Sequence, residues 1–152
     1  MDQRRGGIVK LLTWPAALVI AGILLWYEQF KLLGHPGSVY LFTVLSDWLF
    51  IGGYEKPFRL GVGIAEIIAS MLVVIPATRM IGAAGTLALM SGAIFFHVAS
   101  PLGIDPYDDG GKLFKQACIV WVLSVFILWA YRAEARALFG RLFPSMTRAA
   151  RA

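Results

Sequence analysis

Two ionisable side chains lie inside long apolar segments of this 152-residue sequence. Glu66 lies in the first half of one segment, and His97 stands near the end of the next. A lone carboxylate that faces lipid hydrocarbon costs roughly 3 kcal/mol or more. We therefore expect Glu66 to face the interior of a helical bundle, where it is protonated or paired with a basic side chain. The candidate partners are Lys31, Lys115 and His97.

Several interpretations of these side chains remain open. A buried carboxylate such as Glu66 can transfer protons or hold a ligand, but it can also clamp two helices together without any further role. A single His without a second one nearby is a weak metal-site pattern, and a hydrogen bond to a loop carbonyl is the favoured interpretation of His97. The spacing of Asp105, Asp108 and Asp109 does not match a calcium-binding EF-hand loop, so a turn followed by a helix cap is favoured there. The sequence predicts no metal site.

The composition indicates a membrane protein. Hydrophobic residues make up 59% of the chain and charged residues only 15%. Three long stretches contain no Asp, Glu, Lys or Arg: residues 11–27, 80–102 and 116–131. A helix rises about 1.5 Å per residue and the hydrocarbon layer is about 30 Å thick, so such segments can cross it. The net charge of +5 does not indicate nucleic-acid binding, since most arginines lie at the termini, where membrane orientation explains them.

The sequence predicts an all-α integral membrane four-helix bundle that forms a single transmembrane domain. The predicted spans are residues 8–30, 57–75, 80–99 and 110–131, and a basic tail follows at 132–152. The first apolar run is longer than the core of a signal peptide, so we expect it to be retained as a span. Residues 38–50 are too short to span. With Ser38 as N-cap and with Tyr40 and Trp48, they favour an extra helix in the membrane interface on the outer side. In the tail, Pro144 is expected to end the helical pattern.

Small residues recur every four positions in the second predicted span, at Gly61, Ala65 and Ala69. Small residues let membrane helices approach closely, so we expect this stripe to contact another helix. The sequence predicts the same role for Gly82 and two further glycines of the third span. Val73, by contrast, is expected to face lipid.

The distribution of Lys and Arg predicts that both termini are cytoplasmic, because the more basic side of a membrane protein stays inside. With the N-terminus inside, nine of the fourteen basic residues lie on the inner side: Arg4, Arg5, Lys10, Arg79, Arg132, Arg136, Arg141, Arg148 and Arg151. The remaining five lie outside: Lys31, Lys56, Arg59, Lys112 and Lys115.

This orientation gathers one group of ionisable residues at the outer end of the bundle. We predict that the group binds a ligand: Lys31, Glu66, His97, Asp109 and Lys115. A cavity that is apolar inside and charged at its mouth suits a molecule with a polar head and an apolar tail, such as a quinone or a lipid. The sequence has no nucleophile elbow, phosphate-binding loop or dinucleotide fingerprint, and its single cysteine, Cys118, excludes an intrachain dithiol. It therefore favours an accessory subunit over a stand-alone enzyme.

Three stretches carry a resemblance to a known family: residues 58–66, the turn at 75–79 and the run from 82 to 97. They resemble the DoxX family of small four-helix bacterial membrane proteins, and the resemblance extends over residues 10–131. The family takes its name from a subunit associated with a thiosulfate:quinone oxidoreductase, and the resemblance implies action with partner redox proteins. It marks four family positions without roles: Lys31, Glu66, Arg79 and His97. The lack of a cysteine on the outer side departs from thiosulfate chemistry.

These observations lead to two functional hypotheses. The first is a subunit of a membrane redox assembly in the bacterial inner (plasma) membrane, which holds a quinone without any covalently bound cofactor. The second is a structural or lipid-binding accessory subunit of a larger membrane complex with no redox role. Under both hypotheses, the expected partners are membrane lipid and other membrane or periplasmic protein subunits. A transporter is disfavoured, because a single four-helix chain without repeats offers no alternating-access machinery.

Overall fold

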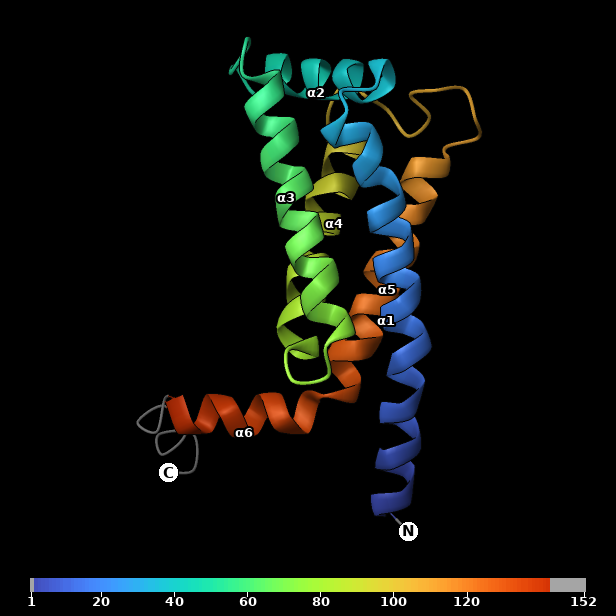
Figure 1. The fold of residues 1–152 in the computed structure, drawn as a ribbon, viewed down its shortest axis with the longest axis vertical. Helices are drawn as coiled ribbons and strands as arrows, with labels where there is room; N and C mark the ends of the chain where they lie inside the picture. Colours follow the sequence, from blue (N-terminus) through green and yellow to red (C-terminus); the bar gives the residue numbers. More distant parts are fainter. Residues whose placement is uncertain (1, 143–152) are drawn as a thin grey trace.

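The computed structural model describes residues 2–142, which form six α-helices and no strand (Figure 1). The helices are α1 (Asp2–Leu32), α2 (Pro36–Trp48), α3 (Glu55–Val74), α4 (Arg79–Ala99), α5 (Lys112–Ala130) and α6 (Arg132–Leu142). Four of them are long and apolar enough to cross a membrane: α1 over Val9–Leu32, α3, α4 and α5. The prediction of an all-α chain with four such helices is confirmed, and it indicates a membrane protein.

The four long helices pack side by side in the cyclic order α1, α3, α4, α5. The shorter helices lie across the bundle, α2 at one end and α6 at the other (Figure 1). We call these ends the α2 end, which includes residues 28–66 and 97–116, and the α6 end, which includes residues 10–14, 73–82 and 127–134. The extra helix expected over residues 38–50 corresponds to α2.

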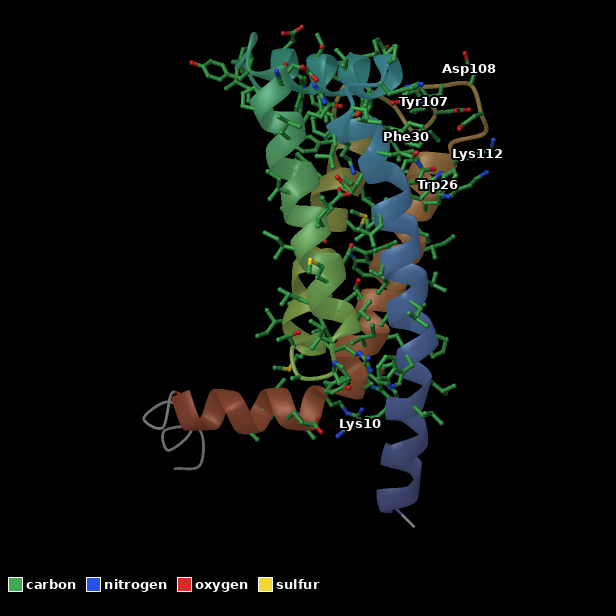
Figure 2. The ribbon with its side chains drawn as sticks, viewed as in Figure 1. Lys10, Trp26, Phe30, Tyr107, Asp108 and Lys112 are labelled. Atoms are coloured by element: carbon green, nitrogen blue, oxygen red, sulfur yellow. The ribbon has the colours of Figure 1, made fainter. Side chains whose placement is uncertain are left out.

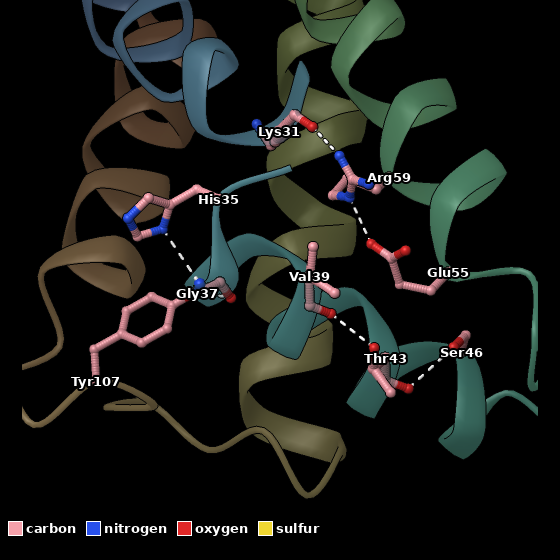
Figure 3. Close-up of polar contacts among 9 residues, drawn as sticks. All are labelled: Lys31, His35, Gly37, Val39, Thr43, Ser46, Glu55, Arg59 and Tyr107. Atoms are coloured by element: carbon pink, nitrogen blue, oxygen red, sulfur yellow. Dashed lines mark hydrogen bonds and ion pairs between the residues drawn. The ribbon is translucent and has the colours of Figure 1, made fainter. Parts of the chain in front are cut away.

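The start of α2 differs from the prediction. The backbone N–H of Gly37 donates a hydrogen bond to Nδ1 of His35 over 3.2 Å, so His35 is the N-cap (Figure 3). Pro36 follows as the first helical residue, a position that its fixed φ angle suits. Ser38, the predicted N-cap, is buried within the first turn, so that prediction was wrong.

The apolar face of α2 holds it against the bundle. Leu41, Phe42 and Leu45 are buried, and the rings of Phe42 and Phe58 of α3 meet edge to face with centroids 5.2 Å apart. Burial of each such side chain contributes roughly 1.5–3 kcal/mol. This small core is separate from the main one, which lies deeper between the four long helices.

The buried face of α3 also differs from the predicted one. Gly61 is exposed, and a Cβ placed on it would meet no atom within 4 Å. Val73, expected to face lipid, is fully buried in the main core. The interior face of α3 runs through Gly63, Glu66 and Val73 at helical spacing, which rotates Gly61 outward. The stripe prediction was therefore wrong at Gly61.

The tight connection between α3 and α4 is organised by Arg79, which is 1% exposed. Its guanidinium donates to the carbonyl oxygens of Val73 at 3.1 Å and Val74 at 2.9 Å, and to the hydroxyl of Thr13 at 3.0 Å. It also lies 4.1 Å from the centroid of the Trp14 ring. The last carbonyls of α3 thus obtain the hydrogen bonds that a helix end lacks.

At the α6 end, Lys10 of α1 donates a hydrogen bond to Glu134 of α6. Figure 2 labels Lys10 beside the start of α6. This hydrogen bond lowers the pKa of Glu134 below its usual range. The predicted helix break at Pro144 and the tail residues Arg148 and Arg151 lie outside the described residues.

Candidate ligand-binding site

A partly open cavity of about 580 Å³ lies at the α2 end. Its apolar lining includes Ile23, Leu24, Phe30, Leu41, Phe42, Leu45, Phe58, Val62, Leu89, Met90, Phe96, Leu102 and Leu113. The polar side chains on its wall are Tyr27, Lys31, His35, Ser38, Glu66, His97, Tyr107 and Gln116. A largely apolar hollow with a few polar groups is the usual form of a small-molecule site.

An ion cluster borders this cavity, and two of its members, Lys31 and Glu66, line it. Lys31 Nζ lies 2.5 Å from Glu66 Oε2, so of the three candidate partners the structure pairs Glu66 with Lys31. The same ammonium lies 2.8 Å from Oε1 of Glu28. Glu28 and Glu66 are only 3% and 5% exposed. Two carboxylates therefore share one cation in a place that water hardly reaches.

Gly63 makes room for this cluster. A Cβ at Gly63 would lie 2.6 Å from Oε2 of Glu28, which is closer than a carbon atom can lie to a non-bonded oxygen without a clash. Because Gly63 has no side chain, the Glu28 carboxyl can lie directly against α3. There Oε2 of Glu28 is buried and has no hydrogen-bond partner, whereas Oε1 has Lys31.

Arg59 fixes the end of α1 that carries Lys31. Its guanidinium donates to the main-chain carbonyl of Lys31, and its Nε donates to Oε1 of Glu55 over 2.5 Å (Figure 3). Arg59 is 5% exposed. Glu55 neutralises this arginine, so its charge is already balanced outside the Lys31 cluster.

His97 of α4 lines the same cavity and is 4% exposed. Its Nδ1 lies 2.6 Å from the carbonyl oxygen of Gly103, in the loop after α4. A carbonyl only accepts, so Nδ1 carries the proton in this contact. The expected hydrogen bond between His97 and a loop carbonyl is present, and Nε2 is the ring nitrogen left for other contacts.

Tyr107 joins the loop between α4 and α5 to the start of α2. Its hydroxyl donates to the carbonyl of Gly37 over 2.8 Å, and its ring lies beside Gly37 (Figure 3). Burial raises the pKa of Tyr107 to about 12. The phenol therefore remains a hydrogen-bond donor throughout the neutral range, and its ring forms part of the cavity wall.

Two of the five predicted site residues lie outside the cavity lining. Asp109 accepts a hydrogen bond from the backbone N–H of Lys112 over 3.0 Å, which makes it a cap near the start of α5. Lys115 is exposed on the first turn of α5. The structure thus places Lys31, Glu66 and His97 on the lining of one cavity and leaves Asp109 and Lys115 on the adjoining loop and helix surface.

Hydrogen bonds between backbone N–H groups and the side chain of Asp105 hold the loop that precedes α5. N–H groups of Gly111, Asp109 and Gly110 hydrogen bond to the Asp105 carboxylate and lower its pKa below the usual range. Gly110 and Gly111 have φ angles of +79° and +68°, which favour glycine. Helical geometry therefore begins at Lys112, slightly later than the predicted start at residue 110.

The sequence prediction missed Glu28 as a site residue. Glu28 and Lys31 are three positions apart in one helix, a spacing that places two side chains on the same face. This spacing next to the apolar run of α1 was the available signal. The prediction also missed the hydrogen bond from Tyr27 to Gln116, which joins α1 to α5 at the cavity wall.

Within residues 2–142, no three His, Cys, Asp or Glu side chains gather into a group that could hold a metal ion. Compared with protein-family models, curated protein sequences and solved structures, the chain matches none. The resemblance to the DoxX family therefore stays a prediction.

Proposed function

We propose that this chain is a multi-pass protein of the bacterial inner membrane that binds a quinone, or an amphiphile of similar shape, as a DoxX-like subunit of a membrane redox assembly. The observation that carries the proposal is the cavity of about 580 Å³, apolar except where Lys31, Glu66, His97 and a few other polar groups reach its wall. A quinone has an apolar ring and tail and two carbonyl oxygens. It therefore needs apolar walls and only a few hydrogen-bonding groups.

The polar wall offers suitable contacts to such a headgroup. Lys31 has three N–H donors, of which Glu28 and Glu66 use two, so the third is left for a ligand oxygen. On His97, the contact with Gly103 uses the Nδ1 proton and leaves Nε2 as an acceptor. Nε2 can therefore accept a hydrogen bond from a hydroxyl of the reduced quinone, the quinol, while the loop holds the ring in place.

The proposed membrane placement puts the α2 end on the outer side and both termini in the cytoplasm, following the distribution of Lys and Arg. Aromatic side chains at this end are exposed, with Tyr40 at 54%, Tyr54 at 65% and Phe50 at 96%. Aromatic rings are enriched at the level of the lipid headgroups. These features support α2 as an interfacial helix, next to which a membrane or periplasmic redox partner would bind.

A cavity-filling substitution tests the proposal directly. Ala93 of α4 lines the cavity, so Ala93→Phe should abolish binding of decylubiquinone to the purified chain in lipid nanodiscs, measured by calorimetry. The matched control is Ala84→Phe, the same change at an exposed position of the same helix. Equal binding by both variants would contradict the proposed site.

The polar groups are tested separately. Glu66→Gln keeps the side-chain shape but removes the charge that pairs with Lys31, and it should weaken decylubiquinone binding about tenfold, or roughly 1.4 kcal/mol, while the helix content is retained. Lys115→Gln is the control, because Lys115 is exposed and outside the cavity lining. Unchanged binding in both Glu66→Gln and His97→Ala would contradict the headgroup assignment.

The same assay separates the competing function. A structural or lipid-binding accessory subunit should take up phospholipid acyl chains in this cavity without any preference for a quinone. Phospholipid in detergent would then displace decylubiquinone at equal concentration. Under the proposed function, decylubiquinone remains bound in a large excess of phospholipid.

A further inference from the structure

The ion cluster at the α2 end has more negative than positive groups. Glu28 and Glu66 both contact Lys31 Nζ, and no second cation contacts either carboxylate in the described part of the chain. Arg59, the nearest other cation on α3, pairs with Glu55. With both carboxylates ionised, the cluster would carry one uncompensated negative charge in a buried place, which is unfavourable because burial penalises an unpaired charge.

One atom in the cluster identifies where this imbalance lies. Oε2 of Glu28 lacks a hydrogen-bond partner among the described residues, and because the side chain is only 4% exposed, bulk water does not supply one either. Buried polar atoms are nearly always hydrogen bonded, so this one calls for an explanation. Oε1 of Glu28 and Oε2 of Glu66 lie 2.8 Å and 2.5 Å from the same Lys31 Nζ, so the two carboxyl groups are neighbours. Two ionised carboxylates cannot hydrogen bond to each other, since neither has a donor.

We infer that Glu28 and Glu66 hold one proton between them beside Lys31, so that the cluster is a buried proton-binding site at the cavity wall. The added proton supplies the missing donor, satisfies Oε2 of Glu28 and balances the charge of the cluster. A metal ion fits this place poorly, because the Lys31 ammonium already lies against both carboxylates and repels a second cation.

The surrounding groups leave this role to the two glutamates. Four other titratable groups line the cavity. Tyr27 lies in α1, His35 just before α2, His97 near the end of α4, and Tyr107 in the loop after α4. The residues of α2 and α5 that line the cavity are uncharged. Gly63 on α3 keeps the proton-accepting oxygen of Glu28 in contact with the backbone and away from water.

The proton site differs from the proposed quinone site and can be tested without any ligand. Dicyclohexylcarbodiimide adds to protonated carboxyl groups in apolar surroundings, and mass spectrometry locates the product. At pH 7 an ordinary glutamate is protonated in only about one molecule in 500. We expect Glu28 or Glu66 of the wild-type chain in lipid vesicles to be labelled about a hundredfold faster than Glu55. Equal rates at the three residues would overturn the inference.

The variants show whether the proton is shared. In Glu28→Gln, the single ammonium of Lys31 neutralises the remaining Glu66, so labelling of Glu66 should stop, and Glu66→Gln should likewise protect Glu28. Lys31→Met removes the cation and should increase labelling of both. Glu55→Gln is the control and should keep the wild-type rate. If either remaining glutamate of the pair were labelled at the wild-type rate, the shared proton would be excluded.

A final arm distinguishes a proton from a monovalent metal ion. Labelling of the wild-type chain is compared in sodium chloride and in choline chloride at the same pH. A proton site should show equal rates in both salts and slower labelling as the pH rises. Protection by sodium would overturn the assignment, whether or not decylubiquinone binds in the separate assay.

Discussion

Each end of the bundle encloses a cation, Arg79 fully and Lys31 partly, and the two cations obtain their partners in different ways. At the α6 end, Arg79 uses its donors on two carbonyl oxygens and a hydroxyl, all neutral, and stacks on Trp14. At the α2 end, Lys31 meets two carboxylates beside an open cavity. The first arrangement is complete without any ligand. The second has an excess of acid and an unused donor, and on these two features the proposed proton and ligand sites rest.

The ends also differ in how they would respond to the same small change. A Cβ on Gly82 would lie 2.2 Å from the backbone nitrogen of Val73, which cannot move away, so Gly82→Ala should destabilise the chain by about 4 kcal/mol. A Cβ on Gly63 meets the flexible end of Glu28, so Gly63→Ala should cost only about 1 kcal/mol. Thermal unfolding in detergent measures both. Equal loss of stability in the two variants would contradict the claim that the neighbour of Gly82 is rigid whereas the neighbour of Gly63 can move.

The second prediction concerns Arg79 itself. Arg79→Met removes three hydrogen bonds and leaves the carbonyls of Val73 and Val74 without donors, which should lower stability by about 3 kcal/mol. Decylubiquinone affinity per folded molecule should not change, because Arg79 lies at the opposite end from the cavity. Arg132→Met, at an exposed position, serves as the control and should change stability by less than about 0.5 kcal/mol. Loss of ligand affinity in folded Arg79→Met would show that the ends are coupled.

The smallest expected effect is at Tyr107. Its folded-state pKa of about 12 lies above the value of about 10 in an unfolded chain, so the protonated phenol stabilises the fold. This contribution is complete below about pH 10 and is lost as the pH rises through about 12.

Tyr107→Phe should therefore lower stability by about 1 kcal/mol at neutral pH, through loss of the hydrogen bond to Gly37. Above about pH 11 the difference between the variant and the wild type should shrink. Melting temperatures of both proteins across this range provide the measurement. A difference that does not depend on pH would mean that the phenol is free to ionise in the folded chain.

The sequence was sufficient for the four long helices and for the interior position of Glu66, whereas the choice of Lys31 among three candidate partners came from the structure. Long charge-free runs predict spanning helices, because their length and apolarity depend on local composition alone. Glu66 could be placed inside the bundle since a carboxylate is so costly in lipid. Both inferences use one segment at a time and need no knowledge of how the helices are rotated.

Rotation of the helices and loop geometry escaped prediction. Gly61 and Gly63 are both small, and only packing against Glu28 shows that Gly63 faces α1. Asp109 and Lys115 were expected at the site because they lie at the same level of the bundle as His97. Their direction depends on the positive φ angles at the two glycines before α5, which the sequence pattern did not resolve.

The turn between α3 and α4 has a consequence for the order in which the chain assembles. Arg79 bonds to carbonyls only five and six positions earlier, so this helical hairpin can form as soon as its two helices exist. The ion pair between Lys31 and Glu66 joins residues 35 positions apart, and contacts of long sequence separation form more slowly. Folding should therefore begin at the hairpin, and the proposed proton and ligand sites should be completed last. Variants that damage those sites can thus still reach a nearly native bundle.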